Sequence, residues 1–373
     1  MRRAALLAVL TLSSAASARE SAPPATLDSF LWDSADYLAA GEPDPYTIDH
    51  RQQFAGVLGR EDLIQAERDF MLETRVGGVC GESVGAPLDM LLGAAAKTRI
   101  VILNDAHMMP LHRADTLGLI EALTDRGFTH FAYESFEESV MARGDEAFVR
   151  EADVFYTRDP AGAALVRRLK AKGVQLVAYE GADHPDGREA AQAANLARLL
   201  DNDPDARLIV VAGHAHVFEH VDGWAGQMMA RRLKDLTGLD PLTISQTACR
   251  SSTGEVVLTR SKRGADGVVE IGETDYALGH PPLTFTAKRP DWRRAWGGVD
   301  TPVPEVFLGL DEPVILDARR LGAPDVAAPD DRLLVLPGET GIPLILEPGQ
   351  YEVRGHAKNG PVAGPVLITV DAD

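Results

Sequence analysis

The sequence has few cysteines: Cys80 and Cys249 are the only two among 373 residues. So low a number excludes a disulfide-rich scaffold and a zinc site built from a cysteine cluster. Neither residue lies in a recognisable nucleophile motif, so a catalytic thiol is the weaker interpretation. Two cysteines far apart in sequence are able to pair in an oxidising compartment, and we favour a disulfide between them.

Positive charge is also scarce. Lys and Arg number 37 against 56 Asp and Glu, which gives a formal net charge of −19. A surface this acidic argues against nucleic acid or anionic membranes as partners, because both repel negative charge. It favours solubility and a small-molecule or peptide substrate that is neutral or cationic. The remaining composition, 45% hydrophobic and 25% charged, is that of an ordinary globular protein.

Long apolar runs are missing, since no internal segment reaches the roughly 18 apolar residues of a membrane helix. The N-terminus instead has Arg2 and Arg3, a short apolar stretch over Ala4–Leu12, and small residues up to Ala18. This order is typical of a secretory signal peptide cut after Ala18, and cleavage would take the net charge from −19 to −21. No cysteine follows the cleavage site as a lipid anchor. We expect a periplasmic or secreted protein with no membrane insertion after cleavage.

From about residue 97 to residue 250, short β-branched runs alternate with segments whose apolar residues recur at helical spacing. Such alternation predicts βαβ units and a mostly parallel sheet with flanking helices, which is the α/β class. Two further helices are expected before this stretch. The expected strands are 99–103, 129–133, 174–179, 207–212 and 242–245, and the expected helices are 59–74, 84–96, 116–126, 161–172, 188–200 and 226–236.

After about residue 250 the alternation stops, and the last part of the chain is rich in Pro and Gly with short β-type runs. We therefore predict three parts. They are a signal peptide over residues 1–18, an α/β domain over 19–300, and a small β-rich C-terminal region over 301–373. The β-type runs of the last part are 314–316, 333–336, 343–346, 351–354 and 366–370.

A carboxylate, a histidine or both follow each of four consecutive expected strands. In open parallel sheets, ligands bind beyond the carboxyl ends of the strands, so we expect these side chains to meet at one edge. Carboxylates and histidines gathered there change one another's proton affinity, as catalytic sites require. The candidate site residues are Asp105, His107, Glu134, His214 and His216.

Each of these residues alone has a structural explanation. A single Asp or Glu after a strand is often a helix cap or a salt-bridge partner. We assign Glu180 and His184 to polar loop positions, and His112, His130 and His220 to the surface or to packing. The coincidence of five candidates at successive strand ends is what indicates an active site.

Four short motifs in this stretch resemble those of a known superfamily. They are Asn104-Asp105-Ala106-His107, Tyr133-Glu134-Ser135, Arg188-Glu189 at a helix start, and Gly213-His214-Ala215-His216-Val217. Their order and positions resemble the superfamily that unites erythromycin esterases, ChaN-type haem-binding lipoproteins and TIKI-type metalloproteases. In that superfamily the first motif usually reads G-E-x-H, and Asn104-Asp105 departs from it. The resemblance covers about residues 97–250 and implies an α/β fold with inserted helices, without fixing one activity.

The residues favour an exported hydrolase that acts on an ester, amide or peptide bond. His107 would act as the general base on water, with Glu134 or Asp105 orienting it. A histidine of the fourth strand end, with Arg188, would stabilise the developing oxyanion. This mechanism is similar to the metal-independent one of erythromycin esterases. We expect no serine nucleophile on a strand-to-helix turn.

A metal-dependent version would use the same residues. Histidine and carboxylate ligands suit Zn, Mn or Co, and a bound ion would acidify a water molecule. By the resemblance to TIKI-type proteases, the ligands would be His107, Glu134 and either His214 or His216. The H-E-x-x-H pattern is absent, and H-x-H is a loose indicator of metal.

Two alternatives without catalysis stay open. ChaN-type proteins bind haem, and an export signal fits a haem- or iron-binding uptake protein without hydrolytic activity. Such proteins are typically lipid-anchored, whereas this sequence lacks the required cysteine. In the other alternative, the site is inactive and the β-rich C-terminal region binds a partner. An aromatic content of 6% gives that alternative little support.

Overall fold

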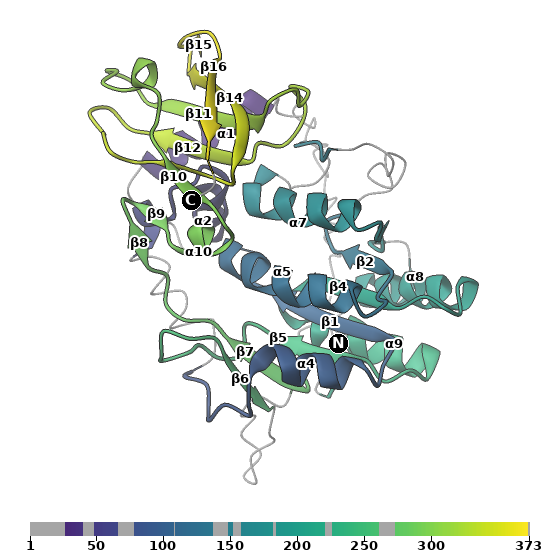
Figure 1. Cartoon of the computed structure of the whole chain (residues 1–373). Helices are drawn as coiled ribbons and strands as arrows, with labels where there is room; N and C mark the ends of the chain where they lie inside the picture. The colour runs from purple at the N-terminus through teal and green to yellow at the C-terminus, as the bar shows by residue number, and fades with distance from the viewer. Residues whose placement is uncertain are drawn as a thin grey trace, which may run out of the picture.

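A computed structural model gives the fold. It describes residues 27–39, 48–65, 78–107, 109–136, 148–151, 158–181, 184–220, 226–260 and 273–371. The predicted signal peptide, residues 1–18, lies outside these ranges. Within them, no helix has the length and apolar character needed to cross a bilayer. A seven-stranded, mostly parallel sheet with helices on both faces confirms the predicted α/β class (Figure 1).

The central sheet has the strand order β3-β2-β4-β1-β5-β7-β6. Neighbouring strands are parallel except for β6, which pairs antiparallel with β7. The centre of the sheet is the pair β1 and β4, in register with Ile100 opposite Leu208. The strands are β1 (Ile100–Asp105), β2 (His130–Tyr133), β3 (Gln175–Val177), β4 (Leu208–Gly213), β5 (Leu242–Ser245), β6 (Val257–Arg260) and β7 (Tyr276–Gly279).

Helices cover both faces of this sheet (Figure 1). On one face lie α4 (Pro87–Ala95), α5 (Pro110–Thr124) and α7 (Pro160–Ala171), and on the other lie α8 (Arg188–Asn202) and α9 (Met229–Thr237). The first three begin with proline, whose fixed φ suits a first helical turn where an N–H is not needed. Asp159 caps α7, because its side chain accepts a hydrogen bond from the N–H of Ala161 at 3.0 Å.

The two cores follow from the alternation of side chains along the central strands. Val101 and Leu103 of β1 pack in the core under α4, α5 and α7, whereas Ile100 and Ile102 pack under α8 and α9. Successive side chains of a strand point to opposite faces, so a strand covered on both faces has to be apolar throughout. This requirement explains the unbroken apolar runs and leaves the polar residues for the strand ends.

The connections place a crevice at the carboxyl ends of β1 and β4. The chain leaves β1 toward α5 on one face, and leaves β4 through the short helix η3 (His214–Val217) toward α9 on the other. Adjacent strands whose connections depart to opposite faces leave a gap between them, where ligands bind in open α/β sheets. β2 adjoins β4 on the other side, so its carboxyl end opens onto the same crevice.

The end of the chain forms a separate β layer, drawn in light green and yellow (Figure 1). β10 (Val299–Thr301) pairs with β13 (Leu344–Leu346). A larger sheet has the order β12-β11-β14-β15, with β16 on β14. Its strands are β11 (Val314–Arg320), β12 (Asp331–Val335), β14 (Gly349–Ala357), β15 (Gly360–Pro361) and β16 (Val366–Val370).

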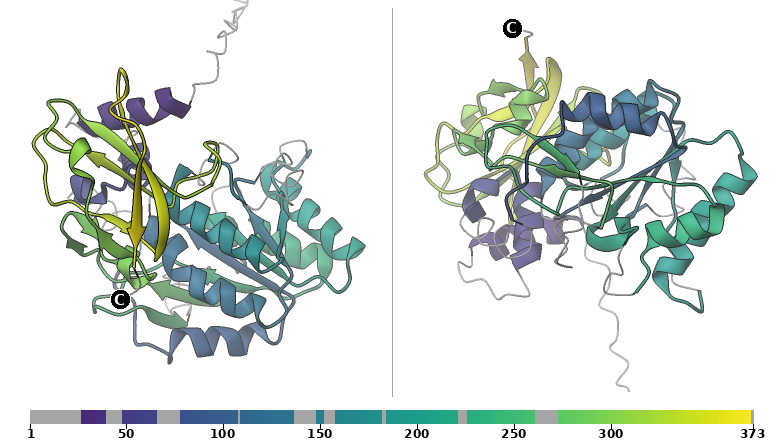
Figure 2. Two further views of the ribbon diagram at one scale, coloured as in Figure 1. Left: turned by 45° about the horizontal axis from the view of Figure 1, so that its top comes forward. Right: turned by 90° about the horizontal axis from the view of Figure 1, so that it is seen from below.

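The N-terminal helices α1 (Leu27–Ala39) and α2 (Ile48–Val57) pack against this β layer (Figure 2). Leu31 and Trp32 of α1 share a buried cluster with Ile315 and Leu334 of β11 and β12. Shorter elements join the β layer to the central sheet: β8 (Phe285–Thr286), β9 (Arg289–Pro290), α10 (Trp292–Ala295) and η4 (Glu305–Phe307). The two ends of the chain therefore stabilise one another.

Two predicted helices differ from the observed ones. The helix expected over 59–74 is interrupted, because Gly59 has a φ of +66° and is followed by a short 3-10 helix, η1 (Glu61–Ile64). Residues 66–74 lie outside the described ranges. The helix expected over 116–126 starts earlier, at Pro110, where proline marks the first turn.

Cys80 and Cys249 form a disulfide across 169 positions of sequence, as predicted. The bond joins the segment before α4 to the loop after β5, and the N–H of Cys80 donates to the carbonyl of Arg250 at 2.9 Å. The disulfide therefore links the segment that precedes β1 to the segment that follows β5.

Candidate active site

Glu134 lies at the centre of the crevice, directly after β2. It is 9% exposed, and its backbone N–H donates to the carbonyl of Val211 at 3.0 Å. One carboxylate oxygen, Oε1, accepts from Nη2 of Arg188 at 2.5 Å, and the other accepts from the N–H of Gly213. Burial alone would raise the pKa of Glu134, but the contacts with His107, His216 and Arg188 lower it far below 4.5. Glu134 is therefore an ionised carboxylate.

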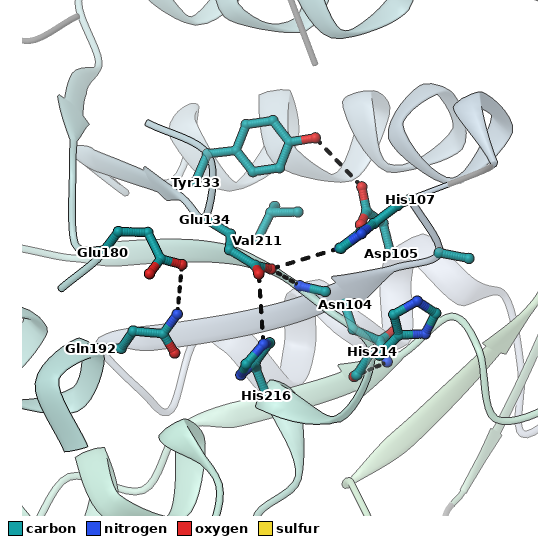
Figure 3. A network of polar contacts seen from close by, with 12 residues as sticks. Asn104, Asp105, His107, Tyr133, Glu134, Glu180, Gln192, Val211, His214 and His216 are labelled. Atoms are coloured by element: carbon teal, nitrogen blue, oxygen red, sulfur yellow. Dashed lines mark hydrogen bonds and ion pairs between the residues drawn. The ribbon is translucent and has the colours of Figure 1, made fainter. Parts of the chain in front are cut away.

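His107 faces Glu134 from the end of β1 (Figure 3). Its Nε2 atom lies 3.9 Å from Oε2 of Glu134, and its side chain is 30% exposed. Burial would lower the pKa of His107, but the interaction with Glu134 and the charges of Asp105 and Glu134 raise it above 6.5. A histidine of this kind is a stronger base than a free imidazole.

The surroundings of Gly213 explain why the G-H-A-H segment begins with a glycine. A Cβ atom at this position would lie 2.2 Å from Nε2 of His107 and 2.9 Å from Oε2 of Glu134. Any side chain would therefore push the histidine and the carboxylate apart. The absence of a side chain, not an unusual φ, is what the site requires here.

Arg188, the first residue of α8, holds two carboxylates together. Its Nη2 lies 2.5 Å from Oε1 of Glu134 and 2.5 Å from Oε1 of Glu180, and its Nε donates to Oε2 of Glu180 at 3.1 Å. Gln192, one turn later on α8, donates to Glu180 at 2.7 Å. The hydrogen bond to Glu180, followed by that to Glu134, raises the pKa of Arg188. The Arg188 side chain is 40% exposed, so it is partly open to solvent at the crevice.

His216 lies behind this group and is buried. Its Nδ1 lies 2.7 Å from Oε1 of Glu189, and its Nε2 lies 3.1 Å from Nη1 of Arg188. Since a guanidinium only donates, Nε2 has to accept, which assigns the proton to Nδ1. Both ring nitrogens are thus engaged, and His216 orients Arg188. Of the two histidines in the H-A-H segment, His216 is the one whose side chain turns inward to Glu134 and Arg188 (Figure 3).

His214 has a different position, at the exposed rim of the site. Its ring centroid lies 5.2 Å from that of His107, and its φ of +40° is rare for a residue with a side chain. The amide of Asn104 holds this conformation by donating to the carbonyl of His214 at 2.7 Å. Asn104 also accepts from the N–H of Gln246 at 2.6 Å. Asn104 therefore joins the ends of β1, β4 and β5, a role that a glycine at this position would not fill.

Asp105 faces away from Glu134 and toward α5. Its Oδ2 lies 3.2 Å from Nη1 of Arg113 and 3.5 Å from the hydroxyl of Tyr133. Arg113 is itself buried and reaches Asp159 at 2.9 Å and the carbonyl of His107 at 3.4 Å. Asp105 therefore acts on His107 through its charge and through Arg113, while Glu134 makes the side-chain contact.

Two residues of this site, Glu180 and Glu189, are not among the predicted site residues. Glu180 was assigned to a polar loop, yet it binds Arg188. Glu189 was quoted only as part of a motif, yet it binds Nδ1 of His216 and accepts from the N–H of Met229 at 2.7 Å. Glu180 directly follows the strand expected over 174–179. The rule that polar residues after strand ends gather at one edge of the sheet therefore applies to Glu180 as well. Of the other histidines, His112 is buried, stacks on His280, and has a lowered pKa because of burial and that neighbour.

The residues of the crevice do not fit a divalent metal. Within the described ranges, no three ligand atoms of His107, Glu134, His214 and His216 come within 4.8 Å of one another, whereas Glu219, His220 and Asp275 do. The Arg188 guanidinium contacts both Glu134 and His216, so a cation already occupies the position between them. A second cation there would be repelled. Glu219 likewise binds the ammonium of Lys234.

Two segments match the sequences of known catalytic motifs, but neither has the structure that the motif requires. Gly81-Glu82-Ser83-Val84-Gly85 matches G-x-S-x-G, but Ser83 is exposed, follows no strand and donates to the carbonyl of Gly85 at 3.0 Å. The segment from His216 to His220 matches H-x-x-E-H, but η3 ends at Val217, so it is not one helix. His216 contacts Glu189 whereas Glu219 contacts Lys234, so these two side chains do not share a site.

Comparisons with known proteins add little to this geometry. No family model matches the sequence, and no curated protein matches it significantly. Among solved structures, the chain is similar to the type III effector HopBA1, with a TM-score of 0.36 and 18% identity over 54% of this chain and 96% of that chain. It is also similar to RRSP, a MARTX toxin effector domain from Vibrio vulnificus CMCP6. There the TM-score is 0.30 and the identity 13%, over 62% of this chain and 46% of that chain. We draw nothing about the reaction from likenesses at these values.

Proposed function

We propose that this protein is an exported hydrolase of ester, amide or peptide bonds that works without a metal ion. The observation that carries the proposal is the pair His107 and Glu134, with Nε2 and Oε2 3.9 Å apart at the carboxyl edge of the sheet. The pair combines an ionised, anchored carboxylate with a histidine that is partly open to solvent. This is the arrangement of a general base and the group that orients it.

The orientation of the imidazole assigns the roles of its two nitrogens. Nε2 is buried and faces Glu134, so it carries the proton that the carboxylate attracts. Nδ1 is then the nitrogen that takes a proton from a water molecule. The resulting hydroxide attacks the carbonyl carbon of the substrate, and His107 afterwards gives the proton to the leaving oxygen or nitrogen. The charge that His107 acquires between these steps is stabilised by Glu134 and Asp105.

Arg188 is the group best placed to stabilise the negative oxygen of the tetrahedral intermediate. It is 40% exposed and contacts Glu134 directly, so its charge is next to the base. His216 and Gln192 fix its surroundings, since His216 contacts Arg188 at 3.1 Å and Gln192 holds Glu180 at 2.7 Å. The carboxylates around it leave the crevice acidic, which favours substrates that are neutral or cationic near the bond that breaks.

The proposal is also supported by the resemblance of the four motifs to the erythromycin esterase superfamily, since these motifs supply His107, Glu134, Arg188 and His216. Export is supported by the N-terminal pattern and by the disulfide, which forms in oxidising compartments. Haem binding is the alternative that the same resemblance raises. Among the described residues, those of the crevice are charged and bonded to one another, an environment that suits a polar reaction better than an apolar porphyrin.

The test is hydrolysis of p-nitrophenyl acetate and butyrate and of a fluorescent casein by the mature protein, with and without EDTA. We expect hydrolysis of at least one probe, unaffected by EDTA. His107→Ala should lower the rate by about a hundredfold or more, the usual contribution of a general base. His184→Ala is the matched control, because this partly exposed histidine contacts Asp186 and not the crevice.

Three results would contradict the proposal. Loss of activity in EDTA with recovery on adding Zn, Mn or Co would replace it with a metal-dependent mechanism. An absorbance band of bound haem, together with no hydrolysis of any probe, would replace it with haem binding. Equal loss of activity in both histidine variants, with lowered melting temperatures, would show that His107 acts on the fold.

A further inference from the structure

A cavity outside the crevice lies between α7 and the C-terminal β layer. Its volume is about 270 Å³, and it is lined by residues of α7, of α10 with the turn after it, and of β11 and its neighbours. None of the crevice residues described above belongs to its lining. A volume of this order is close to the lower end of the range for sites that hold small molecules.

The polar wall of the cavity is rich in arginine. Arg167, Arg168 and Arg320 face two carboxylates, Asp330 and Glu347. Arg167 lies 3.2 Å from Asp330, Arg168 lies 2.5 Å from Glu347, and Arg320 lies 3.5 Å from Asp330 and 2.9 Å from Glu347. Each guanidinium has five N–H donors, and these contacts use few of them. In a protein with a net charge of −19, this wall has an excess of positive charge.

A fourth arginine, Arg293, lines the cavity, but its charge is balanced by carboxylates outside the lining. Arg293 lies 3.6 Å from Glu61 and 3.4 Å from Asp331, and neither carboxylate is part of the cavity lining. Glu121, which lies 3.8 Å from Arg168, is also outside the lining. Inside the cavity, therefore, arginine donors outnumber carboxylate acceptors.

The apolar wall is aromatic. Trp292, Trp296 and Tyr351 line the cavity, with Arg168 over the Trp296 ring at 5.8 Å and Arg320 over the Tyr351 ring at 5.4 Å. Trp292 is 8% exposed, and within the described part of the chain its Nε1–H has no acceptor. Because that N–H is itself shielded from solvent, Trp292 contributes apolar surface to the cavity wall.

We propose that this cavity binds a small organic anion with a flat apolar body, such as an aromatic carboxylate. The planar guanidinium fork matches a carboxylate bidentately, which favours Arg167 and Arg320 as the anion's partners. The aromatic wall would cover the flat body of the ligand. The ligand would touch both α7 and the C-terminal β layer and so join the two parts of the molecule.

The site shares α7 with the crevice. Asp159, the cap of α7, binds Arg113 at 2.9 Å, and Arg113 binds Asp105 at 3.2 Å and the carbonyl of His107 at 3.4 Å. Pro160 and Ala161, directly after the cap, line the cavity. A ligand that shifts the start of α7 would therefore act on the position of His107 through buried ion pairs. The binding itself does not depend on the proposed hydrolysis.

The experiment is a melting-temperature titration and isothermal calorimetry of the full mature protein with benzoate and salicylate. Benzamide serves as the neutral counterpart, and inorganic phosphate as an anion without the flat body. We expect a saturable rise in melting temperature and one-to-one binding for an aromatic carboxylate, because a ligand of the native state stabilises it. Benzamide and phosphate should bind weaker by roughly tenfold or more.

Two variants place the binding in the cavity. Ala164→Phe fills the cavity from α7 without changing any charge, and Arg167→Gln removes one anion partner; both should abolish or weaken the titration. Arg198→Gln, on a different cavity, is the control and should bind as the native protein does. Equal binding of benzoate and benzamide, no binding of either carboxylate, or full binding in Ala164→Phe would overturn the proposal. If a variant unfolds, the comparison of benzoate with benzamide on the native protein still decides it.

Discussion

The Nη2 atom of Arg188 lies 2.5 Å from Oε1 of Glu134, which ties the first turn of α8 to the end of β2. The contact crosses from a helix on one face of the sheet to the end of β2, the strand next to the edge strand β3. It keeps the Glu134 carboxylate ionised in a buried position and holds the cation beside the base. Both the chemistry and the stability of the site therefore depend on this pair.

Removing the guanidinium should change how stability depends on pH. Because the pKa of Glu134 in the folded protein is lowered from 4.5, its contribution to stability is present above that pH and is lost as the pH falls. In Arg188→Gln this contribution shrinks. Urea unfolding should show a variant that is less stable near neutral pH. On going from about pH 5 down to about pH 3, the variant should lose less stability than the native protein, by roughly 1 kcal/mol. An unchanged pH dependence would contradict the assignment.

Neutralising Glu134 should lower the pKa of His107. In the native protein burial lowers this pKa, and the Glu134 interaction with the charges of Asp105 and Glu134 more than offsets it. His107 thus contributes stability that is present below pH 6.5 and is lost as the pH rises through its folded pKa. In Glu134→Gln, an NMR titration of the His107 ring should give a lower pKa, and hydrolysis should fall. Glu352→Gln, in the C-terminal β layer, should change neither.

Asn104→Ala should destabilise the protein by roughly 3 kcal/mol, because it leaves buried partners without hydrogen bonds. The partners are the N–H of Gln246 and the carbonyl of His214, at 2.6 and 2.7 Å from the Asn104 amide. Urea unfolding measures the loss, with Asn202→Ala at the exposed end of α8 as the control. A loss as small as that of the control would mean that water replaces the amide.

Replacing both cysteines by serine should lower stability by about 5 kcal/mol in the chain-entropy model, given the length of the loop closed. That loop spans 169 positions from Cys80 to Cys249. The comparison is urea unfolding of the native protein with and without reductant, beside the Cys80→Ser, Cys249→Ser double variant. Addition of reductant should bring the native protein close to the variant and leave the variant unchanged.

Much of the sheet could be predicted because its strands are apolar on both faces and are followed by helices with clear ends. Val101 and Leu103 serve one core and Ile100 and Ile102 the other, which forces the unbroken run seen in the sequence. Because strands covered on both faces are apolar throughout, polar residues are expected only at the strand ends. The gathering of His107, Glu134 and His216 follows from topology, since β1, β4 and β2 are neighbours.

The roles within the site depend on distances that a sequence does not contain. Asp105 and Glu134 follow strands in the same way, yet one turns to Arg113 and the other to His107. Glu180 was left out because a lone carboxylate after a strand has a common structural explanation, and only Arg188 distinguishes it. Ser83 lies in a sequence pattern that matches G-x-S-x-G, but no strand precedes it, so the pattern alone would mislead. The aromatic cavity joins residues of α7 and β14 that no local pattern relates.

The disulfide has a consequence for how the chain responds to proteolysis. Every residue assigned to the crevice, from Asn104 to His216, lies between the two linked cysteines. A single protease cut anywhere in that interval would leave two polypeptides that remain one covalent molecule. Such a nicked protein would migrate as two bands on a reducing gel and as one on a non-reducing gel. The residues of the crevice would thus stay in one covalent molecule after a first cut.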